Sequence, residues 1–140
     1  MTQRPVPLTN VNIDDSFWSP RLKTVREITI PYQWDALNDR APGAVKSGAV
    51  RNLKIAAGKV KGDPYGMVFQ DSDLAKWLEA AAYSLTTHPD KKLERTVDNV
   101  VNLLEARAIA RTANERLRVM NVARLAARLR RAIGGFFSSC

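Results

Sequence analysis

A short polar stretch in the middle of the chain carries the side chains best suited to hold a ligand. Phe69, Gln70 and Asp71 follow one another directly, and a run of residues with helical periodicity begins just after them. The amide of Gln70 and the carboxylate of Asp71 form hydrogen bonds, and Phe69 offers an apolar face. The three residues are therefore candidates for binding a polar, hydroxylated molecule.

The same stretch also has a purely structural interpretation. Asp71 or Ser72 could cap the following helix, because a short polar side chain accepts hydrogen bonds from the free amides of a first turn. Phe69 could pack in the core. Asp73, near the positive end of the helix dipole, would add about 0.3–1 kcal/mol of stability. From the sequence, both interpretations of this stretch stay open.

Neither a catalytic nucleophile nor a metal site can be assembled from the remaining reactive side chains. Cys140 is the one cysteine and His88 the one histidine. Zinc takes about four protein ligands in structural sites, or three plus water in catalytic ones, and a single cysteine forms no internal disulfide. His88 precedes Pro89, which is typical of a helix end. We therefore predict no catalytic residue, metal site or cofactor in this chain.

The positive charge is concentrated at one end of the chain. The net charge is +8, and residues 107–140 alone hold eight arginines, no lysine and one acid, which gives +7. Basic amphipathic segments bind phosphates or anionic membranes. Because this one lacks interleaved aromatic residues and any known nucleic-acid motif, we predict neither nucleic acid nor membrane as a partner. A small basic helical adaptor for an anionic partner remains the alternative function.

The N-terminus gives no sign of secretion. MTQRPVPLTNVNIDDSFW lacks the apolar core of a signal peptide, and no eighteen apolar residues run together. Together with the single cysteine, this favours the cytoplasm.

The first half of the chain predicts an extended lead-in followed by a bent helix. Pro5 and Pro7 favour extended structure over residues 1–12. Ser19 as N-cap with Pro20 at the first helical position predicts a helix start. This helix should kink or restart at Pro31 and end near residue 38. Its apolar positions recur at helical spacing: Leu22, Val25, Ile28 and Tyr32.

The second half predicts a helical hairpin. A short helix over 50–57 should end at Gly58, and a turn-rich loop should follow over 59–66. Apolar residues then repeat at steps of three and four, which predicts helices over 72–87 and 89–107. The short link between them makes them antiparallel. Because no segment alternates long enough to indicate a strand, the predicted fold class is all-α.

The three tryptophans allow a binding role and a structural role. Trp18, Trp34 and Trp77 could stack on a sugar, but core packing explains them better, above all Trp77 on its helical stripe.

Several strings of residues are more specific in combination than any periodicity. They are IDDSFWSPR at 13–21, IPYQW at 30–34, NLKIAAG at 52–58, and YGMVFQDSD at 65–73 leading into KWLEA at 76–80. With these strings in this order, the chain resembles glycoside hydrolase family 127, the non-reducing-end β-L-arabinofuranosidase family, over roughly residues 11–107.

The resemblance implies an (α/α) toroidal barrel of several hundred residues, of which this chain would supply only the first helices. Residues 13–107 would be the N-terminal part of the catalytic barrel, left incomplete. From residue 108 the likeness stops, and the Arg-rich tail over 108–140 resembles translation in a shifted reading frame. Apolar faces left unpaired in such a fragment invite self-association.

The resemblance also implies a chemistry for the full-length relatives. They hydrolyse terminal β-L-arabinofuranosyl linkages with a zinc-bound cysteine as nucleophile and a glutamate as acid/base, residues that lie beyond the matched stretch. We therefore expect this chain to be an inactive N-terminal fragment of such a glycosidase. Phe69, Gln70 and Asp71, at the mouth of the barrel, would bind an arabinofuranoside weakly.

Overall fold

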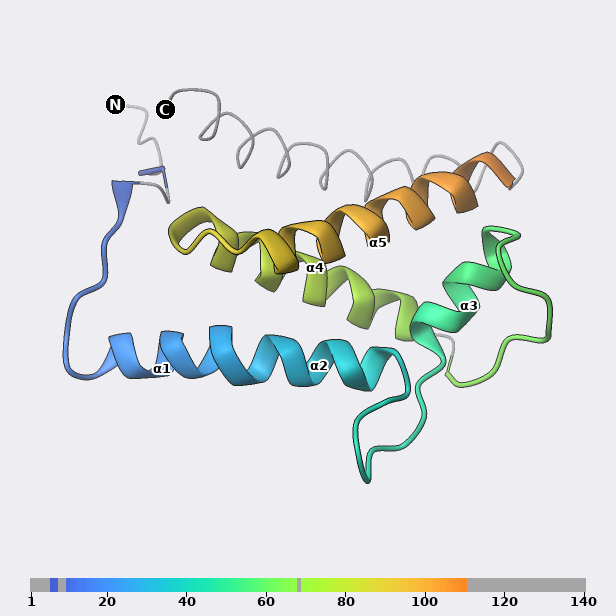
Figure 1. Cartoon of the computed structure of the whole chain (residues 1–140), viewed down its shortest axis with the longest axis horizontal. Helices are drawn as coiled ribbons and strands as arrows, with labels where there is room; N and C mark the ends of the chain where they lie inside the picture. The colour runs from blue at the N-terminus through green and yellow to red at the C-terminus, as the bar shows by residue number, and fades with distance from the viewer. Residues whose placement is uncertain (1–5, 8–9, 68, 111–140) are drawn as a thin grey trace.

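The chain is built from helices throughout the part that the structure describes. The computed structural model describes residues 6–7, 10–67 and 69–110, and no strand occurs among them. The all-α prediction is confirmed. The predicted Arg-rich tail over 108–140 lies almost entirely outside the described residues. Figure 1 shows one long helical rod from the first part of the chain and a helical hairpin beside it, with a shorter helix between the two loops at one end.

The first rod consists of α1 (Trp18–Thr24), the π-helical turn η2 (Val25–Thr29) and α2 (Ile30–Leu37). The predicted cap, Ser19, is wrong, because Ser19 already lies inside the helix. The first free amides, those of Phe17 and Trp18, instead donate to Oδ1 of Asp15. The carboxylate satisfies these amides from a position before the helix, and the helix begins two residues earlier than predicted, at Trp18.

Pro31 lies at the start of α2, where we expected a kink or a restart. The rod in fact continues without interruption, as Figure 1 shows. In a regular helix the proline ring clashes with the carbonyl four residues earlier, that of Glu27. That carbonyl lies in the wider π turn, which relieves the clash locally. The distortion predicted from Pro31 is thus taken up inside the helix.

Two glycines delimit α3 (Ala49–Ala56), close to the predicted helix. Gly48 precedes it with φ +70° and Gly58 follows it with φ +69°, both in the left-handed region that favours glycine. The helix contacts both helices that follow it in the chain, α4 (Gln70–Thr87) and α5 (Lys91–Ala110).

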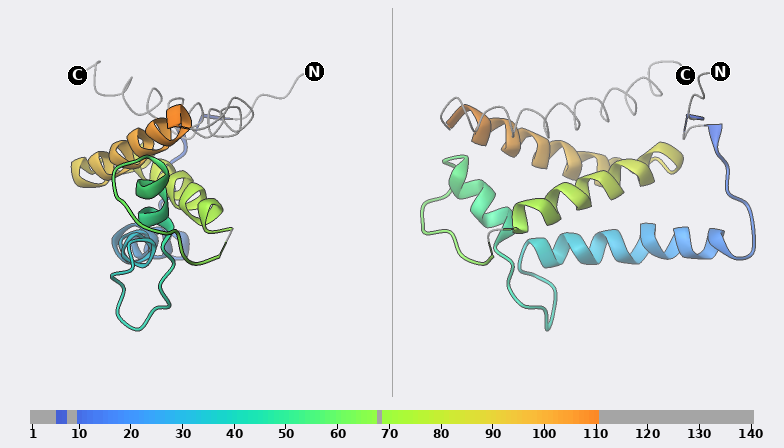
Figure 2. Two further views of the ribbon diagram at one scale, coloured as in Figure 1. Left: turned by 90° about the vertical axis from the view of Figure 1, so that its right-hand side faces the viewer. Right: turned by 180° about the vertical axis from the view of Figure 1, so that it is seen from behind.

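The predicted hairpin is confirmed as α4 (Gln70–Thr87) and α5 (Lys91–Ala110). His88 takes an extended conformation at the end of α4, as predicted for a helix terminus. Asp90 Oδ1 accepts from the amides of Lys92 (2.8 Å) and Leu93 (3.1 Å), which caps α5. The right-hand view in Figure 2 shows the two helices running in opposite directions.

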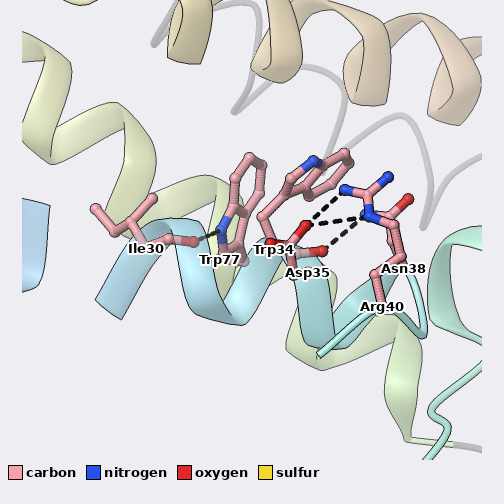
Figure 3. A network of polar contacts seen from close by, with 6 residues as sticks. All are labelled: Ile30, Trp34, Asp35, Asn38, Arg40 and Trp77. Carbon is pink, nitrogen blue, oxygen red and sulfur yellow. Dashed lines mark hydrogen bonds and ion pairs between the residues drawn. The ribbon is translucent and has the colours of Figure 1, made fainter. Parts of the chain in front are cut away.

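Trp77 lies at the centre of the core between α2 and α4. Only 3% of it is exposed, and its ring lies 4.6 Å from that of Trp34. Its indole nitrogen donates to the carbonyl of Ile30 at 3.0 Å, as Figure 3 shows. This hydrogen bond ties the first rod to the hairpin. The main cluster of buried residues is Ile30, Leu37, Ala49, Val50, Leu53, Leu74, Trp77, Leu78, Ala81, Val100 and Leu104.

Of the residues that the structure describes, none form a helix both long enough and apolar enough to cross a membrane.

Candidate functional site

The loop before α4 is held by an amide clamp. Asn52 on α3 donates through Nδ2 to the carbonyl of Tyr65 (2.5 Å), and its Oδ1 accepts from the amide of Tyr65 (3.1 Å). Arg51, one residue earlier, donates to the carbonyl of Asp63 at 3.0 Å. Because α3 is anchored in the core, these contacts fix the path of residues 63–65 toward α4.

Asp39 joins this loop to the loop before α3. Its φ is +60°, in the left-handed region rarely adopted by residues other than glycine. Oδ1 accepts from the amides of Ser47 (2.7 Å) and Gly48 (2.9 Å), while Oδ2 accepts from the hydroxyl of Tyr65. One carboxylate therefore fastens the two loops that flank α3.

The ionisation of Asp39 and Tyr65 reflects this contact. Burial alone would raise the pKa of Asp39, but hydrogen bonds from Gly48, Tyr65 and Ser47, together with the charge of Lys46, outweigh it and hold the pKa below its ordinary value. The pKa of Tyr65 is raised, chiefly because its hydroxyl donates to that carboxylate.

We expect the hydrogen bond between Asp39 and Tyr65 to stabilise the fold only within a window of pH. A carboxyl with a lowered folded pKa contributes stability above its unfolded pKa, about 3.9, and loses it as pH falls through the folded pKa. A phenol with a raised folded pKa contributes below its unfolded pKa, about 10, and loses it as pH rises through the folded pKa.

Urea unfolding of the wild type and of Tyr65→Phe across this range tests the expectation. The free energy of unfolding of the wild type should exceed that of Tyr65→Phe by a constant amount between about pH 5 and pH 9. This difference should shrink below and above that range. Val45→Ala, at an exposed loop position, serves as a control with no pH dependence of its own. A difference between wild type and Tyr65→Phe that stays flat above pH 11 would contradict the assignment.

The three predicted site residues follow this loop but differ in their surroundings. Phe69 is 60% exposed, which excludes the structural alternative that it packs in the core. Gln70 is half-buried, and its Oε1 is buried without a hydrogen-bond partner in the described part of the chain. Asp71 is exposed, and its Oδ2 accepts from Arg107 Nη1 at 2.7 Å.

The predicted cap of α4 is also wrong. The helix begins at Gln70, ahead of both Asp71 and Ser72, and no side chain caps it. The hydroxyl of Ser72 donates back to the carbonyl of Phe69 at 2.7 Å. Asp71 is turned toward Arg107 instead, so a tertiary ion pair replaces the local cap. Asp73 lies in the first turn, as predicted, and pairs with Lys76 at 3.3 Å.

Arg107 is the site residue that the sequence interpretation missed. Its side chain is only 15% exposed, and its Nε is buried without a partner among the described residues. A signal was present, since Arg107 continues the buried stripe of Val100 and Leu104 by helical spacing. In an antiparallel hairpin, that end of α5 must meet the start of α4.

The tryptophans divide between core and surface. Trp77 is buried and Trp34 packs against it, which confirms core packing for these two. Trp18 is 55% exposed and forms an edge-on pair with Phe17 instead. It is therefore not a core residue.

The donor groups in the described residues do not fit a zinc ion. No three histidine, cysteine, aspartate or glutamate side chains come together there. His88 ends α4, where its Nδ1 lies 3.0 Å from the hydroxyl of Thr87. Cys140 lies outside the described residues. The structure therefore supports no chemical step through a metal at these positions.

Comparison with known proteins identifies the family. The model of the GH127 catalytic domain of β-L-arabinofuranosidases matches residues 10–108. The chain is 46% identical over 107 residues to a non-reducing end β-L-arabinofuranosidase from Bifidobacterium longum subsp. longum, covering 68% of this chain and 16% of that protein.

A solved structure agrees with this comparison. The chain matches the crystal structure of a GH127 β-L-arabinofuranosidase from Geobacillus stearothermophilus T6 with a TM-score of 0.69 and 53% identity. The match covers 74% of this chain and 16% of that one, so the chain spans about a sixth of the length of these relatives. The chain belongs to glycoside hydrolase family 127, and its helices correspond to an N-terminal portion of the family's (α/α) barrel.

Proposed function

We propose that this chain provides the sugar-facing loop and first helices of a glycosidase that removes terminal β-L-arabinofuranosyl groups, with catalysis in the full-length protein. The observation that carries the proposal is the clamped loop that ends at an exposed Phe69 and at Asp71. An aromatic face beside a charged acceptor is the combination that suits the apolar and hydroxyl surfaces of a sugar.

Each of the three residues has a separate role in this proposal. Phe69 covers an apolar face of the sugar, and Asp71 accepts from a hydroxyl while Arg107 holds its other oxygen. Gln70 donates through its amide nitrogen, because its Oε1 is buried beside Gly66. Nucleic acid and membranes are not partners in this proposal. The single cysteine supports a location in the reducing cytoplasm.

Titration of the labelled chain with methyl β-L-arabinofuranoside, followed by nuclear magnetic resonance, tests the sugar site. We expect shifts confined to residues 65–71 and the side chain of Arg107. Asp71→Ala should weaken binding about tenfold, because a hydrogen bond to a charged group is worth about 1.5 kcal/mol or more. Asp73→Ala alters another acidic residue in the first turn of α4, and this variant should bind the sugar as the wild type does. Equal effects of the two substitutions would argue against the site.

Catalysis in the full-length relatives is proposed to need a bound zinc ion and a cysteine nucleophile. This chain has too few cysteine and histidine side chains to supply both. The chain holds one cysteine and one histidine. We expect it to release no chromophore from a chromogenic β-L-arabinofuranoside, with or without added zinc, beyond the rate in buffer. The matched control is Cys140→Ser. Zinc-dependent turnover that this substitution abolishes would show that Cys140 is a nucleophile and that the proposal is wrong.

A further inference from the structure

Helix α5 has a buried position that lies outside the core. Figure 1 shows α5 at one edge of the described fold, with α4 between it and the first rod. The core-facing residues of α5 recur at steps of three and four and pack in the main cluster: Leu93, Val97, Val100 and Leu104. Val101 is as deeply buried as Val100, at 1% exposed, yet neither cluster of buried residues in the described part of the chain includes it. Side chains outside these clusters therefore cover Val101.

Acidic residues lie on the same side of α5 as Val101. At about 3.6 residues per turn, Glu94, Asp98 and Glu105 are turned roughly a quarter of a turn away from the core-facing residues. Glu94 and Asp98 are half-buried, whereas Glu105 is exposed. We call these residues the acidic flank of α5: Glu94, Asp98, Val101 and Glu105. Carboxylates that are partly withdrawn from water favour positive neighbours, so the flank suits a cover that is both apolar and basic.

The chain continues beyond α5 with a segment of this composition. Residues 111–140, here called the tail segment, lie outside the described residues and follow directly on Ala110, the last residue of α5. Seven arginines and one acid, Glu115, give the tail segment a charge of +6, and it has no lysine or aspartate. Apolar residues recur along it at steps of three and four: Val122, Leu125, Leu129 and Ile133. Because the tail segment is tethered to α5, its effective concentration at the acidic flank is high.

We propose that the tail segment docks on the acidic flank of α5, with its apolar residues over Val101 and its arginines beside the three carboxylates. The charges are complementary, since the flank carries three acids and the tail segment carries +6. The family match ends at residue 108, so this contact is additional to what the chain shares with its relatives. Docking also occupies the arginines that would otherwise attract an anionic partner.

Limited digestion of the full chain with trypsin tests the proposal, because a docked segment must leave its site before it is cleaved. The measured quantity is the rate of cleavage after Arg118 and Arg130, followed by mass spectrometry. The flank variant Glu94→Lys/Glu105→Lys should be cleaved at least about tenfold faster than the wild type, because like charges then face each other. The matched control is Glu27→Lys/Glu79→Lys, which makes the same change of charge at exposed positions of η2 and α4 and should be cleaved as the wild type is.

A charge swap distinguishes docking from a general loss of stability. The tail variant Arg124→Glu/Arg128→Glu leaves every described residue unchanged and should also be cleaved about tenfold faster. Combining it with the flank variant should restore protection, because opposite charges meet again. Circular dichroism checks the fold of each protein, and if the flank variant unfolds, the tail variant alone carries the test.

Three results would overturn the proposal. The first is cleavage of the tail variant at the rate of the wild type. The second is protection that falls on dilution together with a dimer in sedimentation, because a second copy would then hold the tail segment. The third is binding to phosphatidylserine vesicles or to duplex DNA that is no tighter for the flank variant than for its matched control, since a released tail segment must bind anions better than a docked one.

Discussion

Trp77→Ala should lower the free energy of unfolding by about 3–5 kcal/mol, the range found when a large aromatic side chain is removed from a packed core. Trp77 is 3% exposed, packs on Trp34, and donates to the carbonyl of Ile30. The substitution removes these contacts together and leaves a cavity between the first rod and the hairpin. Because small domains are stable by only about 5–15 kcal/mol, much of the fold's stability depends on this residue.

Urea unfolding followed by far-ultraviolet circular dichroism measures this decrease in the free energy of unfolding without relying on tryptophan fluorescence. Trp18→Ala is the matched control, because Trp18 is 55% exposed and its removal should change stability by less than about 0.5 kcal/mol. Trp77→Phe should fall between the two, since it keeps part of the packing and loses the hydrogen bond. If Trp77→Ala lowered the free energy of unfolding by less than about 1 kcal/mol, the packing of the first rod on the hairpin would not depend on this contact.

The elements that the sequence predicted well are those whose signals are local and repeated. The stripes of α4 and α5 continue over four or more turns, so helical spacing alone identifies them. Gly58 follows α3 as expected, because the effect of a glycine at a helix end acts within a few residues of the chain. The cap of α5 by Asp90 was not predicted, although that contact is equally local.

The wrong cap of α1 is a local error, because Asp15 lies only two residues before Phe17. The other errors depend on contacts between segments distant in sequence. Asp71 does not cap α4, because Arg107, 36 residues away, draws its carboxylate aside. Asp39 fastens Tyr65 across 26 residues, and no local pattern marks either residue. Trp18 satisfies helical spacing, but no other helix in the described part of the chain buries it. Local patterns thus give the helices, whereas the arrangement of the candidate site depends on contacts that only the packed fold creates.

Gly66 is the position in the loop before α4 where an added side chain should disturb the fold most. Its φ is +91°, which a residue with a side chain rarely adopts. A Cβ at this position would lie 2.3 Å from the carbonyl oxygen of Ser47 and 2.2 Å from Oε1 of Gln70. The end of the Gln70 side chain could move away. The Ser47 backbone is less free to do so, because its amide is bonded to Asp39.

Gly66→Ala should therefore destabilise the fold by about 1–3 kcal/mol and release the loop from Asn52. Gly43→Ala is the matched control, since Gly43 also has a positive φ, +73°, yet nothing lies within 4 Å of the added methyl group. The difference between the two variants isolates the steric overlap from the backbone strain that both share.

Hydrogen exchange at the amide of Tyr65, which bonds to Asn52, reports directly whether the loop is still held. We expect this amide to lose protection in Gly66→Ala and to keep it in Gly43→Ala. Equal loss in both variants, or in neither, would show that the close packing of Gly66 does not hold the loop that presents Phe69 and Asp71.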